Sequence, residues 1–97
     1  MAIRLSAYQH KMIKRCFQEV FQVGEVYLFG SRVDSNRKGG DIDLYLMPVD
    51  QQHLLHKKIQ FLARLKRSIG EQKIDVVFAS DQNRLIDQIA RQQGVLL

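Results

Sequence analysis

The sequence has little of what marks secreted, membrane-spanning or disordered proteins. Its 97 residues include one cysteine and one proline. Because Cys16 has no second cysteine to pair with, we expect a packed thiol in a helix rather than a disulfide bridge. A single proline, no low-complexity tract and a hydrophobic content of 45% favour a compact globular chain.

No apolar run approaches the ~18 residues that a membrane span needs, and no charged and apolar leader precedes the first expected helix. We therefore expect a cytoplasmic protein without a membrane partner. We also expect one domain, residues 1–97, which buries roughly 60 to 65% of the surface that the unfolded chain exposes.

The charge balance is positive, with 15 Lys and Arg against 10 Asp and Glu and a net charge of +5. Such an excess suggests an anionic partner, which is a nucleotide, a nucleic acid or an acidic protein face. Composition alone does not choose among these three.

Apolar periodicity predicts a first helix over residues 6–22. Ser6 and Gln9 form a Ser-x-x-Gln capping box, and Gly24 is expected to close the helix as a left-handed cap. The apolar positions at helical spacing are Leu5, Tyr8, Met12, Cys16 and Val20.

A second, longer helix is expected between Asp50, as its N-terminal cap, and Gly70 at its end. Its proposed apolar face consists of Leu55, Ile59, Leu62, Leu65 and Ile69. Its basic residues, which are usually a solvated face, are Lys57, Lys58, Arg64, Lys66 and Arg67.

Three segments read as strands: residues 25–29, 41–47 and 73–79. A last helix is expected over about residues 82–92, and the final GVLL is expected to be a short tail. The order helix, strand, strand, helix, strand, helix predicts an α/β (α+β) fold with helices on at least one face of a sheet.

Period-2 alternation separates the two faces of that sheet. The apolar set expected to face the helices is Ile42, Leu44, Leu46, Ile74, Val76 and Phe78. The opposite and more open face then carries Asp41, Asp43 and Asp75.

Three carboxylates on one face would repel one another unless a cation offset their charge. Hard oxygen ligands select Mg²⁺ or Mn²⁺, and Mg²⁺ is usually held by one or two carboxylates with waters and substrate phosphates. Such an arrangement is typical of phosphoryl and nucleotidyl transfer.

The segment before the aspartates has the character of a phosphate-binding loop. Gly30 lets a phosphate approach the backbone closely, and Ser31 adds a hydroxyl donor. Three basic residues are expected to meet a triphosphate tail, although they also fit a solvated loop: Arg32, Arg37 and Lys38.

The stretch GSRVDSNRKGGDID, residues 30–43, resembles the signature of the DNA polymerase β-type nucleotidyltransferase superfamily. The short chain is similar to its minimal nucleotidyltransferase (MNT) branch. Nine residues separate Ser31 from Asp41, one fewer than in the commonly written pattern. The resemblance implies a nucleotidyltransferase fold, a small mixed sheet with helices packed on one face and the active site on the other.

Position by position, the resemblance implies that Gly30 and Ser31, with Arg32 beside them, bind the triphosphate of ATP. Asp41 and Asp43 would hold Mg²⁺. Asp75 would be the third catalytic carboxylate, which completes a metal site and activates the acceptor hydroxyl.

Free-standing proteins that resemble this one are commonly paired with a small helical HEPN-domain protein, an RNase toxin. The resemblance therefore implies an antitoxin of a toxin–antitoxin system. In some such pairs the antitoxin transfers AMP from ATP to a tyrosine of the toxin, a protein AMPylation.

Other interpretations stay open at this point. The chain is alternatively a non-catalytic module that occludes its partner, a transferase for a small molecule of the aminoglycoside type, or a nucleic-acid-binding protein. A bland interpretation treats Asp41 as a loop cap, and Asp43 and Asp75 as solvated strand residues.

Overall fold

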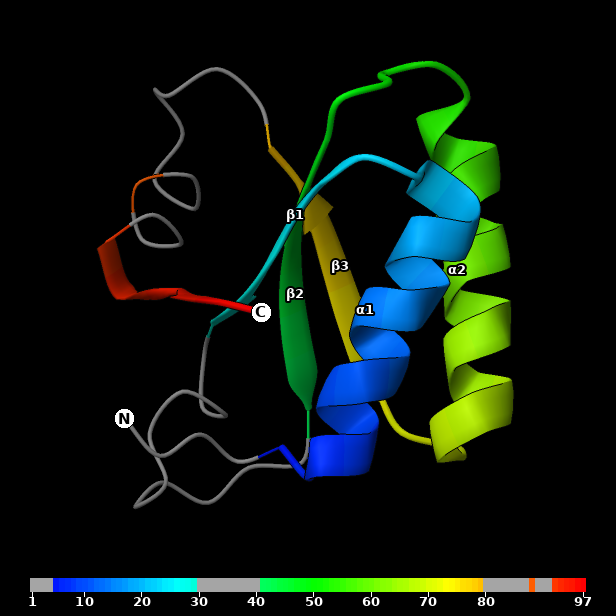
Figure 1. Cartoon of the computed structure of the whole chain (residues 1–97), viewed down its shortest axis with the longest axis vertical. Coiled ribbons are helices and arrows are strands. Elements are labelled where there is room, and N and C mark those ends of the chain that lie inside the picture. Colours follow the sequence, from blue (N-terminus) through cyan, green and yellow to red (C-terminus); the bar gives the residue numbers. More distant parts are fainter. Residues whose placement is uncertain (1–4, 30–40, 80–87, 89–91) are drawn as a thin grey trace.

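The computed structural model describes residues 5–29, 41–79, 88 and 92–97 (Figure 1). The elements in chain order are α1 (Ala7–Phe21), β1 (Gly24–Phe29), β2 (Ile42–Pro48), α2 (Leu54–Ile69), β3 (Ile74–Phe78) and β4 (Val95–Leu96). The α+β class predicted from the sequence is confirmed. The helix expected over residues 82–92 falls mostly outside the described residues.

The four described strands form one mixed sheet in the order β3-β2-β1-β4. β1 is antiparallel to both β2 and β4, whereas β2 and β3 are parallel. Parallel neighbours need a crossover connection, and α2 supplies it.

The expectation of a C-terminal tail is wrong. Val95–Leu96 pairs with β1 as β4, and the backbone N–H of Leu97 donates to the carbonyl of Val26 at 2.8 Å. A strand of two residues is too short to produce an alternation signal, so its pairing with β1 is not visible in the sequence.

Both described helices cover the same face of the sheet (Figure 1). The predicted inward positions of β2, Ile42, Leu44 and Leu46, are fully buried in the core between the sheet and the helices. The helices contribute the buried side chains of Ile13, Cys16, Phe17, Phe21, Phe61 and Leu65. Tyr8 was expected on the inner face of the first helix but is exposed.

The start of α1 is as predicted, but its end is not. Ser6 and Gln9 form the reciprocal capping box, with both hydrogen bonds at 3.0 Å. The C-terminal cap is Gln22 at φ 70°, and Gly24 instead opens β1 at φ 149°. Gly24 serves a packing need, because a Cβ there would overlap the carbonyl oxygen of Met47 and lie 2.7 Å from the Cα of Pro48.

Asp50 does not cap α2. The helix begins at Leu54, after a left-handed His53 whose side chain makes no capping hydrogen bond. Asp50 instead accepts hydrogen bonds from the backbone N–H of Gln52 at 2.9 Å and from Nζ of Lys57 at 3.1 Å. These bonds, the backbone one foremost, lower the pKa of Asp50.

The predicted apolar face of α2 is partly wrong. Phe61 and Leu65 are its buried residues, and Gly70 ends the helix as expected. Leu55 and Ile59, however, are 72% and 61% exposed. Neither α1 nor α2 has the length and apolar character needed to cross a lipid bilayer.

Candidate functional site

Asp43 and Asp75 lie side by side on neighbouring strands. They are direct register partners in the parallel pair of β2 and β3. Residues opposite each other in a parallel pair direct their side chains to the same face. Asp41, two residues before Asp43, immediately precedes β2.

The end of β1 meets the same point of the sheet. Phe29, the last residue of β1, is the register partner of Asp43 in the antiparallel pair of β1 and β2. Gly30, Ser31 and Arg32, the predicted triphosphate-binding residues, follow directly in the chain but lie outside the described residues.

The sheet face that carries the aspartates is only partly open. Two residues beyond Asp43, Tyr45 is completely buried and packs with Phe29 in a second apolar cluster. Partly buried side chains around these two are Tyr27, Met47, Val77 and Ala79. The carboxylates thus lie beside this second apolar cluster, and Asp43 is half-buried whereas Asp75 is exposed.

These surroundings disfavour the ionised form of Asp43. Burial is the largest cause that raises the pKa of Asp43, followed by the negative charges of Asp75 and Asp41 and a hydrogen bond with Asp75. The aspartates therefore interact electrostatically as a group. A positive charge close to this group would favour its ionised form.

Lys73 places a positive charge beside the aspartates. The sequence analysis did not identify it as a site residue. Its Nζ lies 3.5 Å from Oδ2 of Asp41, and its charge lowers the pKa of Asp43 against the other effects. Its carbonyl accepts the backbone N–H of Ile42 at 3.0 Å, which ties Lys73 to the start of β2. Its position two residues before Asp75, on the same side of the alternation, was the available signal.

The donor chemistry of the site fits a hard divalent cation. Within residues 5–29, 41–79, 88 and 92–97, no group of three or more His, Cys, Asp or Glu side chains is arranged to hold a metal. Asp43 and Asp75 nevertheless present adjacent carboxylates, and Mg²⁺ typically takes one or two from the protein and fills its shell with water and phosphate oxygens. The metal-binding role of Asp41, Asp43 and Asp75 stays a prediction.

Comparison with known proteins places most of the chain in one family. The family model described as Polymerase beta, Nucleotidyltransferase matches residues 11–97. The matched region contains β1, β2 and β3, and so all three aspartates. None of the curated proteins matches the chain significantly.

Proposed function

The chain belongs to the DNA polymerase β-type nucleotidyltransferase family, and on this basis we propose that it transfers AMP from ATP to a hydroxyl group of a partner protein. Nucleotidyl transfer in general follows from the family. The observation that carries the proposal is the register of Asp43 with Asp75 on one side and with the last residue of β1 on the other. This register brings two carboxylates and Phe29, the residue before Gly30 in the sequence, together at one point of the sheet.

In the proposed site, each residue has a separate task. Gly30, Ser31 and Arg32 would bind the triphosphate, and Asp41 and Asp43 would hold Mg²⁺. When bound, the metal neutralises phosphate charge and so favours attack on the α-phosphorus.

The transfer itself requires a general base that the acceptor hydroxyl can reach from solvent. Asp75 is the most exposed of the three carboxylates, and it accepts the proton of the acceptor hydroxyl. The acceptor oxygen forms a bond to the α-phosphorus, the bond from that phosphorus to the bridging oxygen breaks, and pyrophosphate leaves.

We propose a tyrosine of a HEPN-domain RNase toxin as the acceptor, so that AMP transfer makes the chain an antitoxin. The charge of the surface supports a protein or polyanionic partner. With the three site aspartates set aside, seven acidic residues remain against fifteen basic ones. Such a surface attracts an acidic partner.

The test is transfer of label from [α-³²P]ATP to the co-purified HEPN partner in the presence of Mg²⁺. The wild-type chain should label the partner, and replacing the acceptor tyrosine by phenylalanine should abolish the label. The Asp41→Asn, Asp43→Asn double variant should lose AMP transfer. The control Asp50→Asn should retain it, because Asp50 lies between β2 and α2 and not among the three site aspartates. Full labelling by the double variant would refute the mechanism.

A second candidate is a non-catalytic module that neutralises its partner by occlusion. It is favoured by α2, whose five basic residues and lack of acidic ones suit an acidic partner surface without any catalysis. Neutralisation of the partner that survives replacement of Asp41, Asp43 and Asp75 would support it over catalysis.

A further inference from the structure

One side of α2 carries large apolar residues that the core does not use. Leu55 and Ile59 are 72% and 61% exposed. Leu62 and Lys66 continue the same line at helical spacing, and Leu62 is half-buried against the core. We name these four residues, Leu55, Ile59, Leu62 and Lys66, the α2 flank.

The α2 flank points away from α1. Phe61 and Leu65 mark the side of α2 that enters the core, and Arg64 marks the side toward α1, because its Nη1 lies 3.5 Å from Oε1 of Glu19. With about 100° of rotation per residue, Leu55 and Ile59 lie roughly 140° around the helix from Phe61, opposite to Arg64. No described helix therefore covers them.

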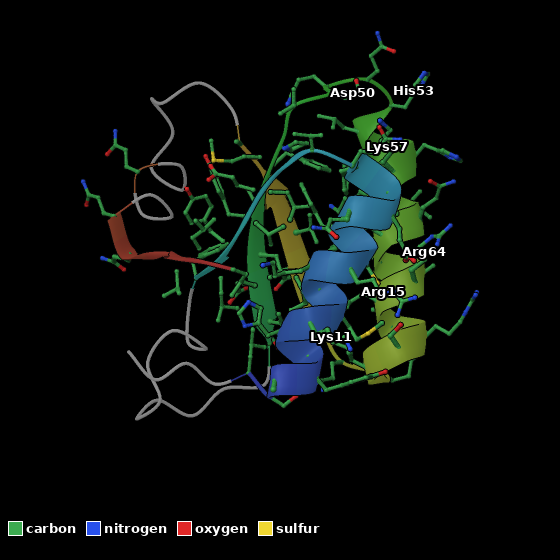
Figure 2. The ribbon with its side chains drawn as sticks, viewed as in Figure 1. Lys11, Arg15, Asp50, His53, Lys57 and Arg64 are labelled. Carbon is green, nitrogen blue, oxygen red and sulfur yellow. The ribbon has the colours of Figure 1, made fainter. Side chains whose placement is uncertain are left out.

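Positive charge borders this apolar line. α2 contains five basic residues and no acidic one. Two of them are in ion pairs, Lys57 with Asp50 and Arg64 with Glu19. Lys57, Asp50 and Arg64 are labelled in Figure 2, and the rotation of about 100° per residue places Lys57 and Arg64 away from the flank. Lys58, Lys66 and Arg67 take part in no ion pair within the described chain, so their charge is available to a ligand.

We propose that the α2 flank is a docking surface for an amphipathic helix of a partner protein, whose apolar seam is bordered by carboxylates. The apolar seam would cover Leu55 and Ile59, and the carboxylates would meet Lys58 and Lys66, because an amphipathic helix binds an apolar surface through its apolar face. A second copy of this chain fits poorly, since apposed flanks would bring like charges together.

This inference rests on the proposed function only in expecting a protein partner. The flank belongs to the helical layer, whereas the aspartates lie on the other face of the sheet. Docking and transfer thus use separate surfaces. A partner can bind at α2 without covering Asp43 and Asp75.

Two synthetic helical peptides with the same leucine seam, one bordered by glutamates and one by lysines, test the proposal on the ¹⁵N-labelled full chain. The glutamate peptide should shift backbone amide signals along residues 54–67 and bind at least tenfold more tightly than the lysine peptide. Raising the salt concentration should weaken its binding.

Variants locate the binding surface. Leu55→Gln with Ile59→Gln should weaken binding of the glutamate peptide at least tenfold, and Lys58→Glu with Lys66→Glu should reverse the peptide preference. Val23→Gln is the control, because Val23 is 65% exposed but lies between α1 and β1. Folding should persist, since the altered apolar side chains are exposed.

Equal affinity for both peptides, amide shifts centred elsewhere, or undiminished binding by the Leu55 and Ile59 variant would overturn the proposal. So would self-association of the wild-type chain that this variant abolishes, because the occupant would then be a second copy. Asp41→Asn with Asp43→Asn should bind the peptide normally, so failure of AMP transfer and failure of docking are separately visible.

Discussion

At Asp43, burial and two neighbouring carboxylates act in the same direction, and together they raise the pKa of its side chain. A carboxyl group with a raised pKa in the folded state binds its proton more tightly there than in the unfolded chain. The free energy of unfolding therefore falls as pH rises from the unfolded value, about 3.9, through the folded pKa. Above that folded pKa the whole penalty of the ionised group is present.

Asp43→Asn removes this penalty. In the absence of divalent metal, we expect the variant to unfold at a higher urea concentration than the wild-type chain at pH 7. The difference should shrink as the pH falls below the folded pKa of Asp43. Addition of Mg²⁺ with ATP should then stabilise the wild-type chain more than the variant, because only a state that binds ligand gains from it.

Asp50→Asn is the matched control, because the pKa of Asp50 is shifted in the opposite direction to that of Asp43. The pKa of Asp50 is lowered, so its contribution to stability is present above the unfolded pKa and is lost as pH falls through the folded pKa. This variant should be no more stable than the wild-type chain at pH 7. Asp43→Asn with unchanged or lower stability in metal-free buffer would contradict the account of the site.

Cys16 offers a second test at the residue scale. Its side chain is 1% exposed, and burial is the largest cause that raises the pKa of its thiol. Because the thiolate is the reactive form, labelling by a thiol reagent such as DTNB should proceed only as fast as the chain unfolds. Labelling in native buffer at the rate of a free cysteine peptide would show that Cys16 is not buried in the core.

At the scale of elements, periodic patterns predicted β2, β3 and the start of α1, but the predicted apolar face of α1 is only partly correct, since Cys16 is buried and Tyr8 is exposed. The prediction of the apolar face of α2 was partly wrong for a physical reason. Leu and Ile occur on two of its sides, so spacing alone does not tell which side enters the core. The side with Phe61 enters the core, because Phe61 has the larger apolar surface to bury, and Leu55 and Ile59 remain in solvent.

Substitution of two glycines measures how closely β1 packs against β2. Gly24 has φ 149° and almost no room for a Cβ. Gly70 has φ 92°, and no described residue other than its chain neighbours lies within 4 Å of a Cβ placed there. Gly24→Ala should cost about 3 kcal/mol of unfolding free energy from strain and overlap, and Gly70→Ala about 1 to 2 kcal/mol from strain alone. Urea denaturation of both variants compares the two costs, and equal losses would contradict the close contact of β1 with β2.

At the scale of the whole molecule, the sequence predicted the placement of the aspartates better than their neighbours. Alternation placed Asp43 and Asp75 on the sheet face that lies away from the helices. It did not give their direct register, since register depends on how the crossover through α2 aligns β2 with β3. The alternation also placed Lys73 on the side of Asp75, but its ion pair with Asp41 depends on the same register, because the two residues immediately precede β3 and β2.

The central claim is that the sheet face with Asp41, Asp43 and Asp75 is the nucleotide site, and the acceptor need not be known to test it. Mn²⁺ replaces Mg²⁺ at oxygen sites and broadens nearby NMR signals. With ATP present, substoichiometric Mn²⁺ should broaden backbone amide signals of residues 41–43 and 73–75 and spare those of α2, and Asp43→Asn should suppress the effect. Broadening centred elsewhere, or unchanged in Asp43→Asn, would contradict the account.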